Sequence, residues 1–228
     1  MKTAKLALLG ALIASFAASA NAGQDLTRNY KVGDVDKYQM TLTATTTMGE
    51  IVSSSKMIHK VVKVYPNGDA DIETSTEDAV VTFMGQEMSA GMETPKTIGK
   101  VDKYGRPVAK DGKAAPGASL DASQFALLGM ENVKELVKGT EFPIDSKTED
   151  GTTKGKAKIV DVVGNVMTIE SDVVVTSKSS PEPMNLITTS KVDIVKNHIL
   201  RVDGTIKGGI PQQPGIEIQD MKFSMVRL

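Results

Sequence analysis

The sequence predicts a mainly β protein with one central helical segment, folded as a curved antiparallel sheet or half-barrel built from two similar β units. Two observations carry this prediction. Long stretches rich in Thr, Val and Ile alternate apolar with polar residues between short turns, and motifs of the first half return in the same order in the second. We expect a signal peptide at 1–22 and a single β-rich domain at 23–228, with β units at 30–110 and 138–228 and a helix at 119–137.

The N-terminal segment is typical of a secretory signal peptide. Lys2 and Lys5 provide a basic head, an apolar run follows, and residues 20–22 (Ala-Asn-Ala) fit the small-x-small pattern that precedes cleavage. The apolar run is too short for a spanning helix, and no later stretch is both long and uncharged, so no integral membrane span is predicted. We expect an exported protein, periplasmic or extracellular, that begins at Gly23.

The charge balance and the composition narrow the range of partners. The chain has 27 Lys and Arg against 28 Asp and Glu, whereas nucleic acids and anionic membranes require a concentrated positive patch. Without cysteine, an exported chain must be stabilised by its core rather than by disulfides. Aromatic residues make up 4% of the chain and Trp is absent, so the 12 methionines take over part of the role of large apolar filler.

The first β unit is predicted as a series of hairpins. Residues 37–47 alternate an apolar face with a polar one, which indicates a half-buried strand. A turn at 48–50 leads into a second long strand at 51–65. Asn-Gly within 66–69 is a strong hairpin signal, because these residues accept the positive φ angles of tight turns. A third strand is expected at 70–83.

The second unit repeats the order of the first. Three pairs of segments share, in turn, a Lys and Gly opening, a Lys and Val strand that ends at a Gly/Asn turn, and a strand followed by a Gly turn. These pairs are 30–38 with 136–142, 60–75 with 158–171, and 99–108 with 200–209. Since three matches in one order are hard to obtain by chance, we expect two similar units within one domain.

Between the units, residues 117–139 have a helical pattern. Ser119 is a candidate N-cap, and Gly139 can end the helix. Gly129 lies near the middle, so two short helices with a bend are an alternative. A single amphipathic helix must bury its apolar stripe against the sheet. The stripe recurs at three- to five-residue spacing and consists of Phe125, Leu128, Val133 and Leu136.

Met84, Met88 and Met92 recur every four residues and raise the alternative of a Cu(I) site, because thioether sulfur is a soft ligand. On a helix they would share one face, but Gly85 and Pro95 argue against a helix there. On a strand neighbouring members of the series would lie about 13 Å apart, so the three could not share one ion. We therefore interpret them as apolar lining and predict no metal site and no cofactor.

The remaining motifs predict no catalytic site. The acidic residues of 69–73 lack the glycine that a calcium loop requires at its sixth position. Ser-x-x-Lys at 53–56 lies in a strand, where positions three apart face opposite sides. His59 and His198 have no accompanying nucleophile motif and are interpreted as ordinary surface histidines. The protein is therefore not expected to be an enzyme.

Three segments carry a resemblance to a family. Residues 30–49 (YKVGDVDKYQMTLTATTTMG), 61–74 (VVKVYPNGDADIET) and 136–144 (LVKGTEFPI) resemble a family of exported bacterial all-β proteins of unknown function. Thr140 and Phe142 depart from its second Lys-x-Gly-Asp-x-aromatic motif. The resemblance implies no activity and no catalytic residues. In shape, the predicted layout is similar to envelope lipoprotein-carrier half-barrels, whose sheet and covering helix enclose an apolar pocket.

Together these features predict an exported, non-enzymatic binding module that holds an apolar or lipid-like ligand between the sheet and the helix. The alternatives are an envelope assembly protein that pairs through sheet edges, and Met-based Cu(I) binding. The expected partner is a hydrophobic small molecule or lipid; the oligomeric state is not predicted. The residues expected to line the pocket are Phe83, Met84, Met88, Met92, Phe125 and Leu128.

Overall fold

The fold is all-β in the part of the chain that the structure describes. The structure is a computed structural model that describes residues 26–88, 96–105, 107–108, 129–130, 133, 135–147, 151–177, 180–209 and 217–228. Within these residues there is no α-helix, and no helix long and apolar enough to cross a membrane.

Twelve strands account for most of the described residues. The first half of the chain forms β1 (Val35–Thr46), β2 (Gly49–Val64), β3 (Ala70–Phe83), β4 (Gln86–Met88), β5 (Thr97–Val101) and β6 (Pro107–Val108). The second half forms β7 (Glu141–Lys147), β8 (Gly151–Val163), β9 (Val166–Ser177), β10 (Ser180–Asp193), β11 (His198–Lys207) and β12 (Ile218–Arg227).

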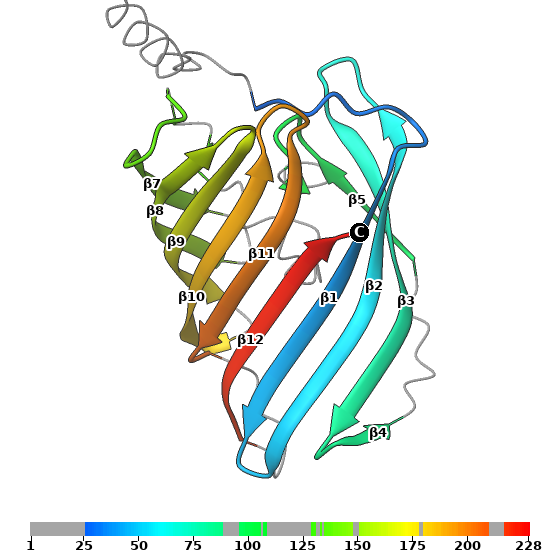
Figure 1. Cartoon of the computed structure of the whole chain (residues 1–228), viewed down its shortest axis with the longest axis vertical. Helices are drawn as coiled ribbons and strands as arrows, with labels where there is room; N and C mark the ends of the chain where they lie inside the picture. Colours follow the sequence, from blue (N-terminus) through cyan, green and yellow to red (C-terminus); the bar gives the residue numbers. More distant parts are fainter. Residues whose placement is uncertain are drawn as a thin grey trace, which may run out of the picture.

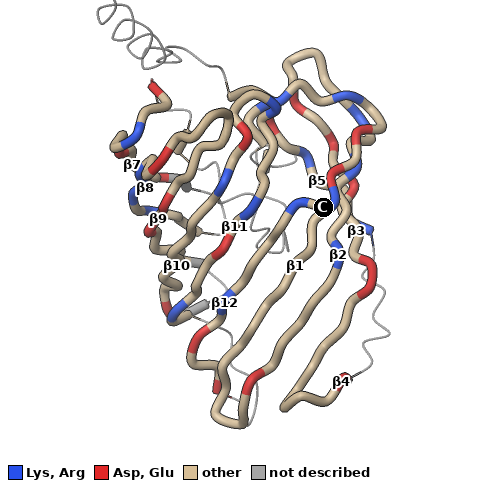
Figure 2. The backbone as a smooth tube through the Cα atoms, viewed as in Figure 1, with Lys and Arg blue, Asp and Glu red and all other residues tan. Residues whose placement is uncertain are grey.

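All strands belong to one antiparallel sheet with the order β6-β5-β3-β2-β1-β12-β11-β10-β9-β8-β7, and β4 pairs with β3 beside this path. Each half is a meander, and the last strand, β12, joins the halves by pairing with β1. Figure 1 shows that the sheet is strongly bent. Among the described strands, the edges β6 and β7 do not pair, so the sheet is open. In the same view, acidic residues mark the lower ends of β12, β2 and β4 (Figure 2).

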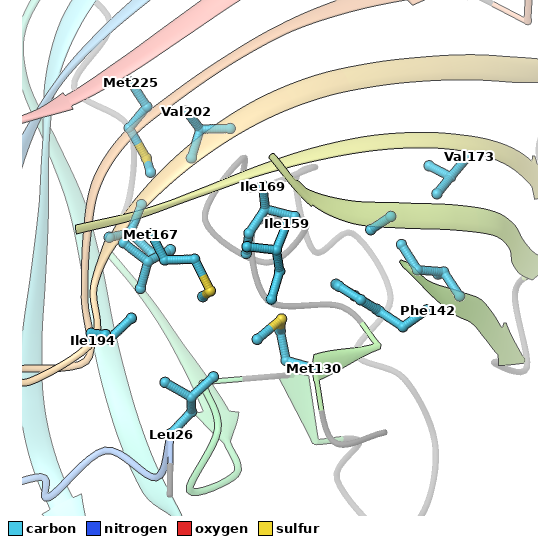
Figure 3. Packing of buried hydrophobic residues seen from close by; sticks show 14 of the residues in the cluster. Leu26, Met130, Phe142, Ile159, Met167, Ile169, Val173, Ile194, Val202 and Met225 are labelled. Atoms are coloured by element: carbon cyan, nitrogen blue, oxygen red, sulfur yellow. The ribbon is translucent and has the colours of Figure 1, made fainter. Parts of the chain in front are cut away.

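The core lies on one face of the bent sheet, here called the inner face. In β9, Met167, Ile169 and Val173 are buried, whereas Glu170 and Asp172 between them are exposed. This alternation is the period of two that a half-buried strand requires. Figure 3 shows buried side chains of β7, β8, β9, β11 and β12 gathered on this face, with Leu26 and Met130 on the opposite side of the cluster.

The two halves begin with the same backbone geometry. Gly33 and Gly139 both adopt positive φ angles, 95° and 93°, which glycine accepts without steric cost. In each half the next strand ladder then starts from the same hydrogen-bond pattern. The four bonds are Gly33 N–H to Val61 O (2.9 Å), Val61 N–H to Asp34 O (2.9 Å), Gly139 N–H to Ile159 O (2.7 Å) and Ile159 N–H to Thr140 O (2.9 Å).

A bulge follows at the same place in both halves. The register of β2 against β3 shifts between Val61 and Lys63, and the register of β8 against β9 shifts between Ile159 and Asp161. Bulges of this kind increase the local twist of a strand pair. The matched bulges mean that positions in the two halves can be compared residue by residue.

The predicted helix at 119–137 is wrong where the structure describes it. Gly129 has a φ of 79°, a left-handed conformation that ends a helix, and a Cβ there would lie 2.9 Å from the Pro143 carbonyl oxygen. Glu135 forms an isolated bridge. Met130 and Leu136 nevertheless join the core, so this segment buries apolar side chains without being helical. Residues 119–128 lie outside the described residues.

Candidate functional site

The inner face is covered unequally in the two halves. In β9 and β10 its side chains are almost fully buried, whereas in β2 only Met57 and Val61 are buried. Around the lower ends of β1 and β12, where β1 turns into β2, apolar inner-face side chains remain partly exposed. These side chains are Met40, Leu42, Ile51, Met221 and Phe223. The least covered of them is Leu42, at 37% exposure.

One row of register partners crosses this open part of the inner face. Leu42 lies opposite Ser53 on β2 and opposite Phe223 on β12. Phe223 in turn lies opposite Gly204, and a Cβ on that glycine would come within 2.3 Å of the Phe223 ring. The missing side chain therefore lets the ring lie across β11. The row thus holds two large apolar groups side by side, partly accessible to solvent.

The lower end of this face is bounded by two hairpin tips. The β1–β2 turn is held by Thr46, whose hydroxyl donates to the Gly49 carbonyl oxygen at 2.7 Å and accepts from Met48 N–H at 3.1 Å. The neighbouring β3–β4 turn contacts it, since Met84 N–H donates to Glu50 O at 3.4 Å. A Cβ on Gly49 would lie 3.3 Å from Met84 Cγ, so the Met84 side chain lies over the β1–β2 tip.

Of the six residues predicted to line a pocket, the structure describes the side chains of Phe83 and Met84. Phe83 is half-buried at the end of β3, opposite Ile51. Met84 lies at the hairpin tip and is 70% exposed. Met88 lies on β4, where its backbone pairs with Val81 of β3, and its side chain is outside the described part. Met92, Phe125 and Leu128 also lie outside the described residues, so their role stays a prediction.

A polar cluster lies at the opposite, upper end of the sheet. Asp36 Oδ1 accepts a hydrogen bond from Arg227 Nη2 at 2.6 Å and lies 3.2 Å from His198 Nδ1. Burial raises the pKa of Asp36, but the hydrogen bond from His198 and the charges of His198 and Arg227 more than offset this and lower it to about 2. The carboxylate is therefore ionised at any neutral pH. It holds together the starts of β1 and β11 and the end of β12.

The equivalent position in the second half is apolar. Asp36 is the third residue after Gly33 and pairs with His59, while Phe142 is the third residue after Gly139 and pairs with Ala157. Phe142 and Ala157 are both buried in the core. His59 instead packs edge-on against Tyr38, with ring centroids 5.5 Å apart. One framework thus carries a polar pair in the first half and a packed apolar pair in the second.

Sequence reasoning missed this cluster because its members are far apart along the chain. His198 and Asp36 are separated by 162 positions. The available signal was the repeat itself, in which an Asp stands where the second copy has a Phe. In the described residues, no hydroxyl group hydrogen-bonds to His198, and no three His, Cys, Asp or Glu side chains are arranged to hold a metal ion. The cluster as described is an ion-pair network without a nucleophile.

A shallow depression of about 400 Å³ lies elsewhere, mostly on the outer face over β10, β11, β12 and β1. Hydroxyl and charged side chains dominate its rim. The outward-facing ones are Thr41, Thr43, Thr189, Thr205, Asp203, Lys222 and Ser224. Ile187 and Phe223 also line it, so the depression is mixed in character and shares Phe223 with the inner-face row.

Comparison with known proteins does not assign this chain to a class of proteins. The chain matches no protein-family model, and no curated protein has a similar sequence. The open antiparallel sheet defines an architecture, and an architecture by itself does not define a function. The functional argument therefore rests on the inner face.

Proposed function

We propose that this protein is an exported, non-enzymatic binding module that holds an apolar or lipid-like ligand on the inner face of a half-barrel. The observation that carries the proposal is the partial exposure of Leu42, Phe223 and their neighbours on a face that is otherwise the core. An acyl chain laid along this row would bury surface that the described residues leave open, gaining about 0.8 kcal/mol for each CH₂ group removed from water.

The proposed half-barrel is also consistent with two similar β units and with a resemblance to exported all-β proteins. The matching turns at Gly33 and Gly139 and the matching bulges support two related units. The bent, open sheet supports the likeness in shape to lipoprotein carriers. We take the difference along the sheet as specialisation: β9 and β10 pack, whereas β1 and β12 present a surface.

The first test is mass spectrometry of organic extracts from protein purified out of its native compartment, where we expect a co-purifying amphiphile. The second is binding of a fluorescent fatty acid to Leu42→Asp and to the matched control Val174→Asp. Val174 lies on the outer face of β9, away from the depression, and is 42% exposed, so the two changes are similar in chemistry and exposure. Loss of binding in both variants or in neither would contradict the proposal.

The two alternatives have less support in the described residues. The sheet edges are protected in the manner of natural sheets: β6 has two residues, and β7 carries Pro143 and the exposed charges of Glu141 and Asp145. Cu(I) binding would rest on Met84 and its neighbours. Anaerobic Cu(I) titration of Met84→Leu against the unaltered protein tests it, and equal binding would end that alternative.

A further inference from the structure

The exposed methionines of the two hairpin tips are not explained by the fold. Met48 is 51% and Met84 is 70% exposed, and the hydrogen bond from Met84 N–H to Glu50 O places the tips side by side. Met84 also has a φ of 50° and is followed by Gly85 at 77°. Such a two-residue turn favours Asn-Gly, because a left-handed backbone disfavours a large side chain. A strained, exposed apolar residue indicates a function outside folding.

Among the described residues of these tips, the charged side chains all have one sign. Glu50, Glu87 and Glu217 are exposed, and Glu217 O accepts a hydrogen bond from Thr47 N–H at the β1–β2 tip. Figure 2 shows acidic positions at the lower ends of β2, β4 and β12. The sequence has no Lys or Arg in 38–55, 78–95 or 208–221, although the whole chain is nearly neutral. An ordinary solvated surface intersperses both signs.

We propose that the acidic Met tip, formed by Met48, Met84, Glu50, Glu87 and Glu217, docks a cationic, apolar segment of a partner protein. Methionine suits this role because its flexible, polarisable side chain adapts to different apolar partners. The carboxylates select for Lys or Arg and repel acidic partners. An anionic membrane is disfavoured for the same reason. This inference does not depend on the ligand proposal, although the tip lies at the open end of the same face.

The experiment measures binding of a labelled amphipathic Lys/Leu peptide to the full chain by fluorescence anisotropy, with Glu/Leu and Lys/Ser peptides of equal length alongside. We expect Lys/Leu to bind at least about tenfold more tightly than either, with an affinity that falls as salt rises. Equal binding of Lys/Leu and Glu/Leu, or no binding of Lys/Leu, would overturn the proposal.

Two sets of variants locate the interaction. The triple change Glu50→Gln, Glu87→Gln and Glu217→Gln should weaken Lys/Leu binding about tenfold. The matched change Asp145→Asn, Glu170→Gln and Asp172→Asn alters three exposed acids of β7 and β9 and should leave binding unchanged. If both triples weaken binding equally, the attraction is general and the proposal fails.

A second pair of changes separates the apolar contribution from folding. Met48→Asn with Met84→Asn should weaken Lys/Leu binding about tenfold without lowering the Tm, because both side chains are exposed and asparagine tolerates the left-handed backbone at position 84. Unchanged peptide binding in this variant would contradict the role of the methionines. If the tip variants instead lose binding to zwitterionic phosphatidylcholine vesicles and keep peptide binding, the surface is a membrane face and the proposal is overturned.

Discussion

The two halves of the sheet use one strand framework for different purposes. In β9 and β10, inner-face residues are buried in strict alternation, and Phe142 and Ala157 fill the position that follows the shared turn. In the first half, Asp36 and His59 occupy the equivalent position, and Leu42 is partly open to solvent. Most of the buried hydrophobic cluster comes from residues 130–225, so we expect this part to contribute most of the stability, while β1 and β2 expose apolar and ionic groups that folding alone would not favour.

The largest effect should come from giving the second half the polar residue of the first. Phe142→Asp buries a carboxylate in the core without the Arg and His partners of Asp36, and should cost about 4 kcal/mol or more, or prevent folding. Urea unfolding of Phe142→Asp and of the control Phe142→Leu measures it. A cost for Asp no greater than that for Leu would mean that the two positions are less different than their burial indicates.

A smaller effect compares one residue type across the halves. Leu186 is 3% exposed and Leu42 is 37% exposed, both on the inner face. Leu186→Ala should lower the free energy of unfolding by about 3 kcal/mol, and Leu42→Ala by about 1 kcal/mol, because only the first leaves a closed cavity. Equal costs in the denaturant midpoint would show that the inner face of the first half is as well packed as that of the second.

The polar cluster of the first half should contribute stability that depends on pH. The pKa of Asp36 is about 2 in the folded protein against 3.8 for the free group, so the folded state binds this proton less readily than the unfolded state. The contribution, about 2 kcal/mol, is therefore present above pH 4 and is lost as the pH falls through 2. Asp36→Asn should be destabilised by this amount at pH 7 and by progressively less at pH 3 and below.

Urea titrations at pH 7, 4 and 3 measure the pH-dependent difference. Lys222→Met is a suitable control, since it removes an exposed charge of β12 without touching Asp36. A difference between Asp36→Asn and the unaltered protein that does not change with pH would mean that the ion-pair network is not the cause.

The smallest effect is a gain in stability at the tip. Met84→Asn relieves the left-handed strain at a φ of 50° and should raise the free energy of unfolding by about 1 kcal/mol. Calorimetry should show a modest increase in Tm. Gln86→Asn, in the adjacent strand, is the control and should give no gain. A lower Tm for Met84→Asn would indicate that the methionine side chain stabilises the tip by packing over Gly49.

Local patterns in the sequence predicted much of the fold. The strand expected at 70–83 is observed as Ala70–Phe83, and the Asn-Gly turn before it has Gly68 at a φ of 88°. The helix prediction failed in its described part because periodicity alone did not show that Gly129 packs against β7. The prediction that residues 1–22 are a signal peptide lies outside the described residues and stays a prediction.

The candidate sites were harder to predict because they depend on long-range pairing. Nothing in the local pattern of β12 specifies β1 as its neighbour, and the contact between Asp36, His198 and Arg227 follows from that pairing. The tip is an intermediate case. Each hairpin could be predicted, but the contact of Met84 with the β1–β2 turn depends on how β2 and β3 align.

The position of β12 also affects the order in which strand pairs can form during folding. β12 follows all the other described strands along the sequence, yet it lies between β1 and β11 at the centre of the sheet. During synthesis the two meanders can form separately, but each keeps an unpaired edge until the final 10-residue strand arrives to join them. Such late, distant pairing slows folding, since loop-closure entropy must be overcome before the contacts form. A chain that stops short of β12 would expose two open edges at once, and each is a template for aggregation.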